Sequence, residues 1–236
     1  MSCLPLSPRS THTALSSALA LLFASPTAMA ADLTGSAALT SDYVWRGSSQ
    51  TTEDPAVQAG GKLSANNGLY ASLWGSNVRF ATDDDARLEL DGVLGWSGSL
   101  AQDWTLDVNL TRYAYPGSTA DLDWNEAGIT VAWLQNYWVQ VTHSSDALAS
   151  GERGTYAQVG ARYPLGEACR LESAVGRYWL QGSNGVDYTH GQVGAVWMFH
   201  APFELRVTGH LTDGAARRLF PGAAGSRVEV AVQGSF

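Results

Sequence analysis

Polar and apolar residues alternate along most of this chain with a period of two. Near its end, Val228, Val230 and Val232 alternate with Arg227 and Glu229. Successive side chains of a β-strand point to opposite faces, so such a segment predicts a strand with one apolar and one polar face. The same pattern recurs from one end of the chain to the other. It indicates an all-β fold and argues against a helical bundle.

About twelve segments follow this pattern, and together they predict a transmembrane antiparallel up-and-down β-barrel. The expected strands cover residues 34–46, 56–65, 69–80, 88–100, 104–114, 124–134, 137–144, 155–163, 170–180, 188–199, 203–212 and 226–236. The register of the third segment is left open, because Leu69 and Leu73 compete with Tyr70 and Trp74 for the outer face.

The connections between these segments alternate in length. The short ones are residues 66–68, 101–103, 135–136, 164–169 and 201–202. The longer ones are residues 47–55, 81–87, 115–123, 145–154, 181–187 and 213–226. Short periplasmic turns and longer outer loops are typical of outer-membrane barrels. An even number of strands then places both termini on the periplasmic side.

Aromatic residues gather near the expected strand ends, as in the girdles of membrane barrels. Those expected near the outer rim are Tyr43, Trp45, Tyr113, Tyr115, Trp124, Tyr156, Trp179 and Tyr188. Those expected near the inner rim are Trp104, Trp133, Tyr137, Tyr163, Trp197, Phe199, Phe203 and Phe236. A secreted β-sandwich or a lipocalin-like barrel is the alternative, and its aromatic residues would concentrate in the core.

Residues 1–30 have the pattern of a secretory signal peptide, and residues 31–236 then form the barrel domain. An apolar run from Ala14 to Ala24 precedes the small-residue triplet Ala28-Met29-Ala30. The run is shorter than the roughly 18 residues that a membrane-spanning helix needs. We therefore expect cleavage after Ala30 and export toward the bacterial outer membrane. We expect outer-membrane lipid to surround the barrel.

Two further features restrict the partners. The last strand ends at Phe236, and a terminal Phe after an alternating strand is similar to the signal by which the barrel-assembly machinery recognises outer-membrane proteins. The formal net charge is −8, and Lys62 is the only lysine. A nucleic-acid partner is excluded because no basic stripe is available to neutralise phosphates.

Several segments resemble the TorF-type porin family. They are Ser41-Asp42-Tyr43-Val44-Trp45-Arg46-Gly47, Gln50-Thr51, Pro55-Ala56-Val57-Gln58, Tyr70-Ala71-Ser72-Leu73-Trp74-Gly75-Ser76-Asn77-Val78, Glu89-Leu90-Asp91, Gly95-Trp96-Ser97-Gly98, Tyr115-Pro116-Gly117 and Asn125-Glu126. The resemblance implies an outer-membrane β-barrel that acts as a porin, and it names no solute.

Charged residues on the polar faces of the strands are expected to line the lumen, since lipid surrounds the barrel. The outer half would hold Asp42, Arg46, Glu89, Asp91, Glu126, Arg227 and Glu229. The inner half would hold Lys62, Asp107, Arg162, Arg170, Glu172, Glu204 and Arg206. Carboxylates outnumber guanidinium groups in the outer half, which predicts passage of small polar solutes with a weak preference for cations. The alternative is that these charges pair and fill the barrel.

No catalytic site, cofactor or metal site is expected. His143, Ser144 and Asp146 form the one suggestive group for a rim lipid hydrolase or acyltransferase, but neighbouring side chains on a strand point to opposite faces. The run Asp83-Asp84-Asp85 is interpreted as a solvated loop tip rather than a calcium site. The leading hypothesis is a passive channel. A closed structural or surface-binding barrel without conduction is the main alternative, and a rim enzyme is the third.

Overall fold

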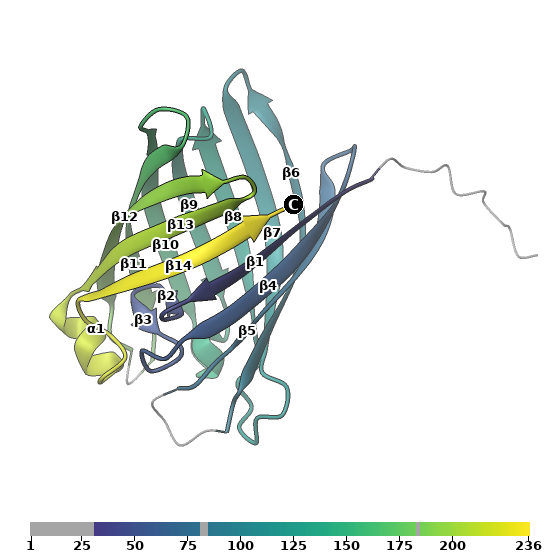
Figure 1. The fold of residues 1–236 in the computed structure, drawn as a ribbon. Coiled ribbons are helices and arrows are strands. Elements are labelled where there is room, and N and C mark those ends of the chain that lie inside the picture. Colours follow the sequence, from purple (N-terminus) through teal and green to yellow (C-terminus); the bar gives the residue numbers. More distant parts are fainter. Residues whose placement is uncertain (1–30, 81–84, 183–184) are drawn as a thin grey trace, which may run out of the picture.

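The computed structural model describes residues 31–80, 85–182 and 185–236. The predicted signal peptide, residues 1–30, lies outside this part of the chain. Twelve antiparallel strands close into a barrel, which confirms the predicted fold class (Figure 1). They are β1 (Ala31–Thr40), β4 (Ala56–Ala65), β5 (Leu69–Asn77), β6 (Leu88–Ala101), β7 (Trp104–Ala114), β8 (Trp124–Trp133), β9 (Tyr137–Ser144), β10 (Gly154–Pro164), β11 (Cys169–Leu180), β12 (Tyr188–His200), β13 (Phe203–Thr212) and β14 (Arg227–Ser235).

The barrel is sealed between its first and last strands. Strand β1 pairs with β4 on one side and with β14 on the other, so that Leu39 lies opposite both Val57 and Val232. Each of the remaining barrel strands pairs with the barrel strands that precede and follow it in the sequence. Closure leaves no strand edge with unpaired backbone groups, which is what a sheet needs if it is to stand in hydrocarbon.

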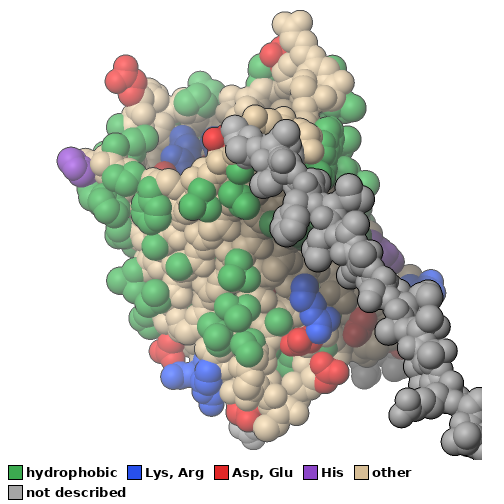
Figure 2. All heavy atoms as spheres, turned by 90° about the vertical axis from the view of Figure 1, so that its right-hand side faces the viewer, with side chains coloured by type: hydrophobic (Ala, Val, Ile, Leu, Met, Phe, Trp, Pro, Cys, Tyr) green, Lys and Arg blue, Asp and Glu red, His purple; other side chains and the backbone are tan. Residues whose placement is uncertain are grey.

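The outer face of the barrel is apolar. Figure 2 shows hydrophobic side chains spread over the barrel wall, with charged side chains gathered toward its ends. Leu94 is 67% exposed, whereas Glu89 on the opposite parity of the same strand is 2% exposed. The aromatic residues predicted for the inner rim are all exposed on this face: Trp104, Trp133, Tyr137, Tyr163, Trp197, Phe199, Phe203 and Phe236. Among the described residues, no helix is long and apolar enough to cross a membrane.

Short and long connections alternate around the barrel, as predicted. The short ones hold two to four residues, for example 66–68 and 201–202, and all lie at one end. The long ones lie at the other end and include the 3-10 helix η1 (Ala147–Ala149) and the α-helix α1 (Gly214–Leu219). Ala31 and Phe236 both lie at the short-turn end (Figure 1). That this end faces the periplasm stays a prediction.

The prediction that the first strand continues to residue 46 was wrong. Strand β1 ends at Thr40, and the chain then turns into the barrel as a two-stranded hairpin of β2 (Val44–Trp45) and β3 (Ser48–Ser49) (Figure 1). Arg46 and Gly47 form its turn with φ angles of +46° and +83°. Positive φ at both central residues is the geometry of a tight hairpin turn. We call residues 42–51 the inward hairpin.

The outer aromatic girdle was also predicted wrongly for most of its members. Tyr113, Trp124, Tyr156 and Tyr188 are at most 8% exposed. They lie at the predicted height, but they point into the lumen and pack against one another or the inward hairpin instead of facing outward. Trp179, which is 40% exposed, does face outward.

The structure also settles the register of β5. Leu69 and Leu73 are 55% and 60% exposed and lie on the outer face. Tyr70 and Trp74 are half-buried and point into the barrel. The inward position of Tyr70 brings its hydroxyl group to Asp107 of β7, at 3.0 Å.

Candidate functional site

The inward hairpin is fixed at its base by Asp42. One carboxylate oxygen of Asp42 accepts hydrogen bonds from Ser49 Oγ at 2.6 Å and Thr51 Oγ1 at 3.0 Å. The other accepts from Arg227 Nη1 of β14 at 3.1 Å. Asp42 is 4% exposed, so these bonds replace the water that a buried carboxylate loses. The base of the hairpin is therefore tied to the last strand.

Arg46 stands at the tip of the hairpin and is held by the barrel wall. Its Nη1 and Nη2 donate to the two carboxylate oxygens of Glu126 at 2.9 and 2.6 Å, and Nη2 also donates to Thr142 Oγ1 at 3.1 Å. The guanidinium carbon lies 4.0 Å from the ring centroid of Tyr156 and 4.9 Å from that of Tyr178. A two-pronged ion pair combined with cation–π contacts is a strong set of interactions for a buried guanidinium group.

The turn of the hairpin touches the wall so closely that only glycine fits beside Arg46. A Cβ atom on Gly47 would lie 2.7 Å from His190 Cβ and 2.7 Å from Thr212 Cγ2. The third point of contact is the last long loop, where Ser48 pairs with Ala224 and Ser49 N donates to Ala223 O at 2.9 Å. The hairpin is thus attached at its base, its tip and its second strand.

Aromatic rings pack around the hairpin. Trp45 makes edge contacts with Tyr113, Trp124 and Tyr178 at centroid distances of 6.1 to 6.3 Å. Tyr113 and Trp124 stack at 4.3 Å. Trp45 also packs against a buried cluster that includes Tyr188 and joins residues of η1 and α1. Side chains therefore occupy much of the lumen at the long-loop end, the predicted outer half, and a hollow of about 340 Å³ remains beside the hairpin.

Helix α1 covers this cluster and is capped by Asp213. The Asp213 carboxylate accepts from the N–H groups of Ala215 and Ala216 at 2.9 Å, and from Thr189 N at 2.8 Å. Partial burial raises the pKa of Asp213, but these backbone hydrogen bonds outweigh it and hold the pKa below its usual value. The cap is charged at neutral pH and fixes the last loop over the barrel.

Two neighbouring acidic residues on the inner face of β6 have no ion-pair partner among the described residues. Glu89 and Asp91 lie two positions apart on the inner face of β6, and Tyr43 of the hairpin donates to Glu89 Oε1 at 3.3 Å. Glu89 Oε2 and Asp91 Oδ1 are buried and accept no hydrogen bond within the described part of the chain. They form the acidic pair of the outer lumen that no arginine balances.

Below the hairpin lies a polar cavity of about 500 Å³. Its lining is mostly uncharged and polar, and it includes Ser72, Asn109, Thr111, Gln140, Thr142, Gln158 and Gln192. Arg46 and Glu126 border it on the outer side. Lys62, whose ammonium group lies 3.7 Å from the Tyr70 ring centroid, also borders it. Asp107 is held beside this cavity by hydrogen bonds from Tyr70 and Asn109.

The inner half of the lumen carries a network of alternating charges. Glu172 accepts from Arg162 at 3.1 Å, from Arg170 at 2.7 Å and from Arg206 at 2.7 Å. Glu204 joins the same network through Arg170 and Arg206. Three arginines thus share two glutamates, which leaves one positive charge in excess on this wall.

The structure places all the sequence-predicted lumen residues inside the barrel and pairs most of them. Of the five carboxylates expected in the outer half, Asp42 is paired with Arg227 and Glu126 with Arg46. Glu229 accepts from Thr40 at 2.9 Å, and its other oxygen lies 2.9 Å from His210 Nε2. Whether these residues line a conducting path stays a prediction.

The sequence reasoning missed several lumen residues. Tyr113, Trp124, Tyr156, Tyr178 and His190 all point inward. Their parity gives the signal that could have found them, because each lies an even number of positions from a polar inward residue of its own strand. Tyr156 shares its parity with Gln158, and Trp124 shares its parity with Glu126.

The residues proposed for a rim enzyme do not assemble into a triad. His143 points outward, and its Nδ1 lies 2.9 Å from Thr155 Oγ1. Ser144 is buried on the opposite face, where its Oγ accepts from Asp146 N at 3.0 Å. Asp83 and Asp84 lie outside the described residues, and Asp85 accepts two hydrogen bonds from Thr119. Within the described ranges, no three metal-ligating side chains cluster.

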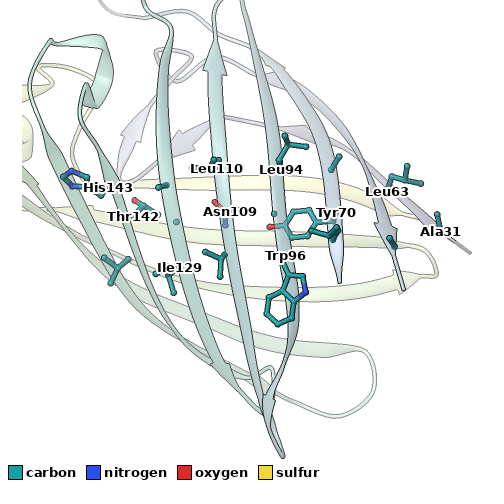
Figure 3. Close-up of a pocket in the computed structure, with 18 residues that line it drawn as sticks. Ala31, Leu63, Tyr70, Leu94, Trp96, Asn109, Leu110, Ile129, Thr142 and His143 are labelled. Carbon is teal, nitrogen blue, oxygen red and sulfur yellow. The ribbon is translucent and has the colours of Figure 1, made fainter. Parts of the chain in front are cut away.

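A larger hollow of about 860 Å³ lies on the other side of the wall. Its lining is largely apolar and comes from β1 and β4 to β9, with outward side chains such as Leu63, Leu94, Leu110 and Ile129 (Figure 3). These residues belong to the exposed apolar face of the barrel, so the hollow is separate from the polar cavity of the lumen.

The fold is similar to that of solved porin structures. A structure described as KdgM porin aligns with a TM-score of 0.53 at 8% identity, covering 88% of this chain and 99% of that chain. A NanC porin structure aligns with a TM-score of 0.55 at 10% identity, covering 87% and 99%. At these identities the likeness concerns the fold alone. No curated protein matches this chain.

The resemblance to the TorF-type family stays a prediction, although the likeness to porin structures agrees with its porin-like character. The family assignment comes from sequence comparison. A bacterial family of unknown function matches residues 24–236. Because this match covers nearly the whole chain, the protein belongs to the Gcw_chp family of bacterial proteins of unknown function.

Proposed function

We propose that the protein is an outer-membrane channel for passive diffusion of small hydrophilic solutes, and that the structure represents its closed state. The polar cavity of about 500 Å³ inside an apolar-walled barrel carries this proposal. Amide and hydroxyl groups line it. Such groups can replace the hydration shell of a polar solute and do not require the solute to carry a charge of one sign. The inward hairpin separates this cavity from the long-loop end, so conduction requires the hairpin to move.

We also propose that both termini face the periplasm and that the barrel-assembly machinery recognises β14 with Phe236. The short turns at the end that holds both termini support this orientation. Trypsin added to intact cells should cleave after Arg217 or Arg218, which are exposed on the long-loop side. Cleavage only after the cells are opened would show the reverse orientation.

A weak preference for cations is part of the proposal, and it now depends on Glu89 and Asp91. The other outer carboxylates have cationic or hydrogen-bonding partners. The structure of KdgM porin in complex with disordered oligogalacturonate shows an acidic oligosaccharide with that protein. An acidic solute in this chain would meet Glu89 and Asp91 with no arginine beside them, so we expect neutral or cationic solutes to pass more readily.

The alternative of a closed structural barrel is favoured by one observation, the inward hairpin with the aromatic rings packed around it. An engineered disulfide that reversibly holds the hairpin in place distinguishes the two functions. Ser48 and Ala224 are antiparallel partners, and the spacing of such pairs, about 4.5 to 5.5 Å between Cα atoms, suits a disulfide. The test uses Ser48→Cys with Ala224→Cys in a Cys169→Ser background, and each single cysteine variant is the control.

The channel hypothesis predicts that the oxidised double variant blocks swelling of sugar-loaded liposomes and that dithiothreitol restores it. The single variants should permit swelling under both conditions. If the oxidised double variant and the single variants behave alike while all of them conduct, the solute path does not pass the hairpin. If none conducts, even after deletion of residues 43–50, the structural barrel is the correct function.

A further inference from the structure

The wall residues that hold Arg46 form a site of defined chemistry. Glu126 comes from β8, Thr142 from β9, Tyr156 from β10 and Tyr178 from β11. All four belong to the barrel and none to the hairpin, so they remain in place when the hairpin moves. We infer that these four residues, the guanidinium site, bind the guanidinium group of a small solute, and that Arg46 is an internal ligand that occupies the site in the closed channel.

The geometry of the site selects a guanidinium group over an ammonium group. Both oxygens of Glu126 accept from the two terminal nitrogens of one planar fork, at 2.9 and 2.6 Å. A compact ammonium group cannot make this parallel pair of hydrogen bonds. The rings of Tyr156 and Tyr178 lie 4.0 and 4.9 Å from the guanidinium carbon. These ring faces favour a flat, weakly hydrated cation.

The charge of Glu126 makes exchange of one cation for another the favoured way to open the site. Glu126 is 5% exposed, and a buried carboxylate without a partner is strongly destabilising. Departure of Arg46 alone would leave Glu126 with the Tyr113 hydroxyl, at 3.3 Å, and no cation. Arrival of a solute guanidinium at the same moment keeps the charge paired.

The site is reached from the polar cavity. Glu126, Thr142 and Tyr156 all border that cavity, together with Gln140 and Gln158. A solute that placed its guanidinium group on Glu126 would direct the rest of its body toward these amides. The ligand class is therefore a small guanidinium compound with a neutral polar or aliphatic remainder.

Binding is tested directly on the purified barrel in detergent, where conduction plays no part. Arg46→Asn removes the internal ligand and keeps a residue that tolerates positive φ before Gly47. Isothermal titration with methylguanidinium should give at least about tenfold tighter binding to Arg46→Asn than to the unmodified protein, because the tethered ligand no longer competes. Methylammonium should bind Arg46→Asn at least about tenfold more weakly than methylguanidinium.

Two controls make the binding result specific. The double variant Arg46→Asn with Glu126→Gln should lose the binding. Arg177→Asn removes an exposed arginine paired with Asp187 and should behave like the unmodified protein. Equal affinity of Arg46→Asn and the unmodified protein, or equal binding of methylammonium, would overturn the guanidinium site.

A second measurement keeps Arg46 in place and covers the case in which its variant does not fold. Methylguanidinium should slow disulfide formation between Ser48→Cys and Ala224→Cys, because it competes with Arg46 and releases the hairpin. An unchanged rate at concentrations on the order of tens of millimolar would contradict the inference. Methylammonium at equal concentration is the control.

The opening of the channel by such solutes rests on the proposed function, whereas binding does not. Binding without conduction in any variant would leave the guanidinium site and remove the channel. Conduction without guanidinium binding would leave the channel and remove the site.

Discussion

The guanidinium group of Arg46 and the carboxylate of Glu126 face each other through two parallel hydrogen bonds, although 80 positions separate the two residues in sequence. Neither side chain is more than 8% exposed. This pair joins the hairpin tip to strand β8 and closes the outer lumen around it. It is the contact whose loss should change the proposed channel most.

Glu126→Gln is expected to release the hairpin without unfolding the barrel. Removing one partner of a buried ion pair costs about 3–5 kcal/mol, because the remaining charge is left uncompensated. The hairpin can avoid this cost by moving out of the lumen, because Arg46 is then hydrated again. Trypsin should then cleave after Arg46 in Glu126→Gln and leave that bond intact in the unmodified protein. Arg177→Gln serves as the control, and equal cleavage in all three proteins would contradict the prediction.

Gly47→Ala is expected to push the hairpin away from the wall. The new methyl group would lie 2.7 Å from both His190 Cβ and Thr212 Cγ2, and Gly47 also has a φ of +83°. Gly117→Ala is a matched control, since Gly117 has a φ of +87° and open space around its Cβ position. Open probability in planar bilayers should rise for Gly47→Ala and stay unchanged for Gly117→Ala. A rise in both would assign the effect to backbone strain.

Glu89→Gln combined with Asp91→Asn should reduce the preference for cations. These two neighbouring carboxylates form no ion pair, so their removal withdraws the negative charge that the pair carries when ionised. The reversal potential under a salt gradient measures the change. Asp121→Asn, at an exposed loop position, is the control. A reversal potential equal to that of the unmodified protein would show that permeating ions do not sense this pair.

Glu172→Gln should shift selectivity in the opposite direction. Arg170 and Arg206 would then keep Glu204 as their acidic partner, and Arg162 would lose its ion pair. The expected result is a reversal potential displaced toward the equilibrium potential of the anion. Glu167→Gln, in an exposed short turn at the same end of the barrel, provides the comparison. If Glu172→Gln moves the potential toward cations, the network does not act on the permeating ion.

Asp213→Ala should loosen the last long loop by about 1 kcal/mol, the usual cost of losing a helix cap. Faster tryptic cleavage after Arg217 or Arg218 would report this, and Asp121→Ala is a loop control. The pKa of Asp213 is lowered in the folded protein, so the cap contributes fully above its ordinary pKa of about 3.9 and is lost as pH falls through the lowered value. At neutral pH, cleavage at equal rates would contradict the capping role.

Most of the barrel was predictable because each strand carries its own period of two. An apolar outer face and a polar inner face are local properties, and so is the length of each connection. Val44 and Trp45 also have the strand conformation that was predicted. Their partner is β3 and not the barrel, and the Arg46-Gly47 turn that directs them inward was the local signal that went unused.

The site was less predictable, for two different physical reasons. Parity predicts the inward direction of the aromatic residues, as Tyr156 with Gln158 shows, whereas position along the strand predicts only their height in the barrel. The pairing of Arg46 with Glu126, and of Asp42 with Arg227, depends on how a loop folds into a closed cylinder. No periodicity within a single segment carries that information.

The seam between β1 and β14 imposes an order on assembly. Asp42 follows the first strand, and the Arg227 side chain that anchors it belongs to the last strand, 185 positions later. Ser48 likewise needs Ala224, just before that strand. The inward hairpin can reach its final position only after β14 has paired with β1. A partly assembled barrel is therefore open at its long-loop end.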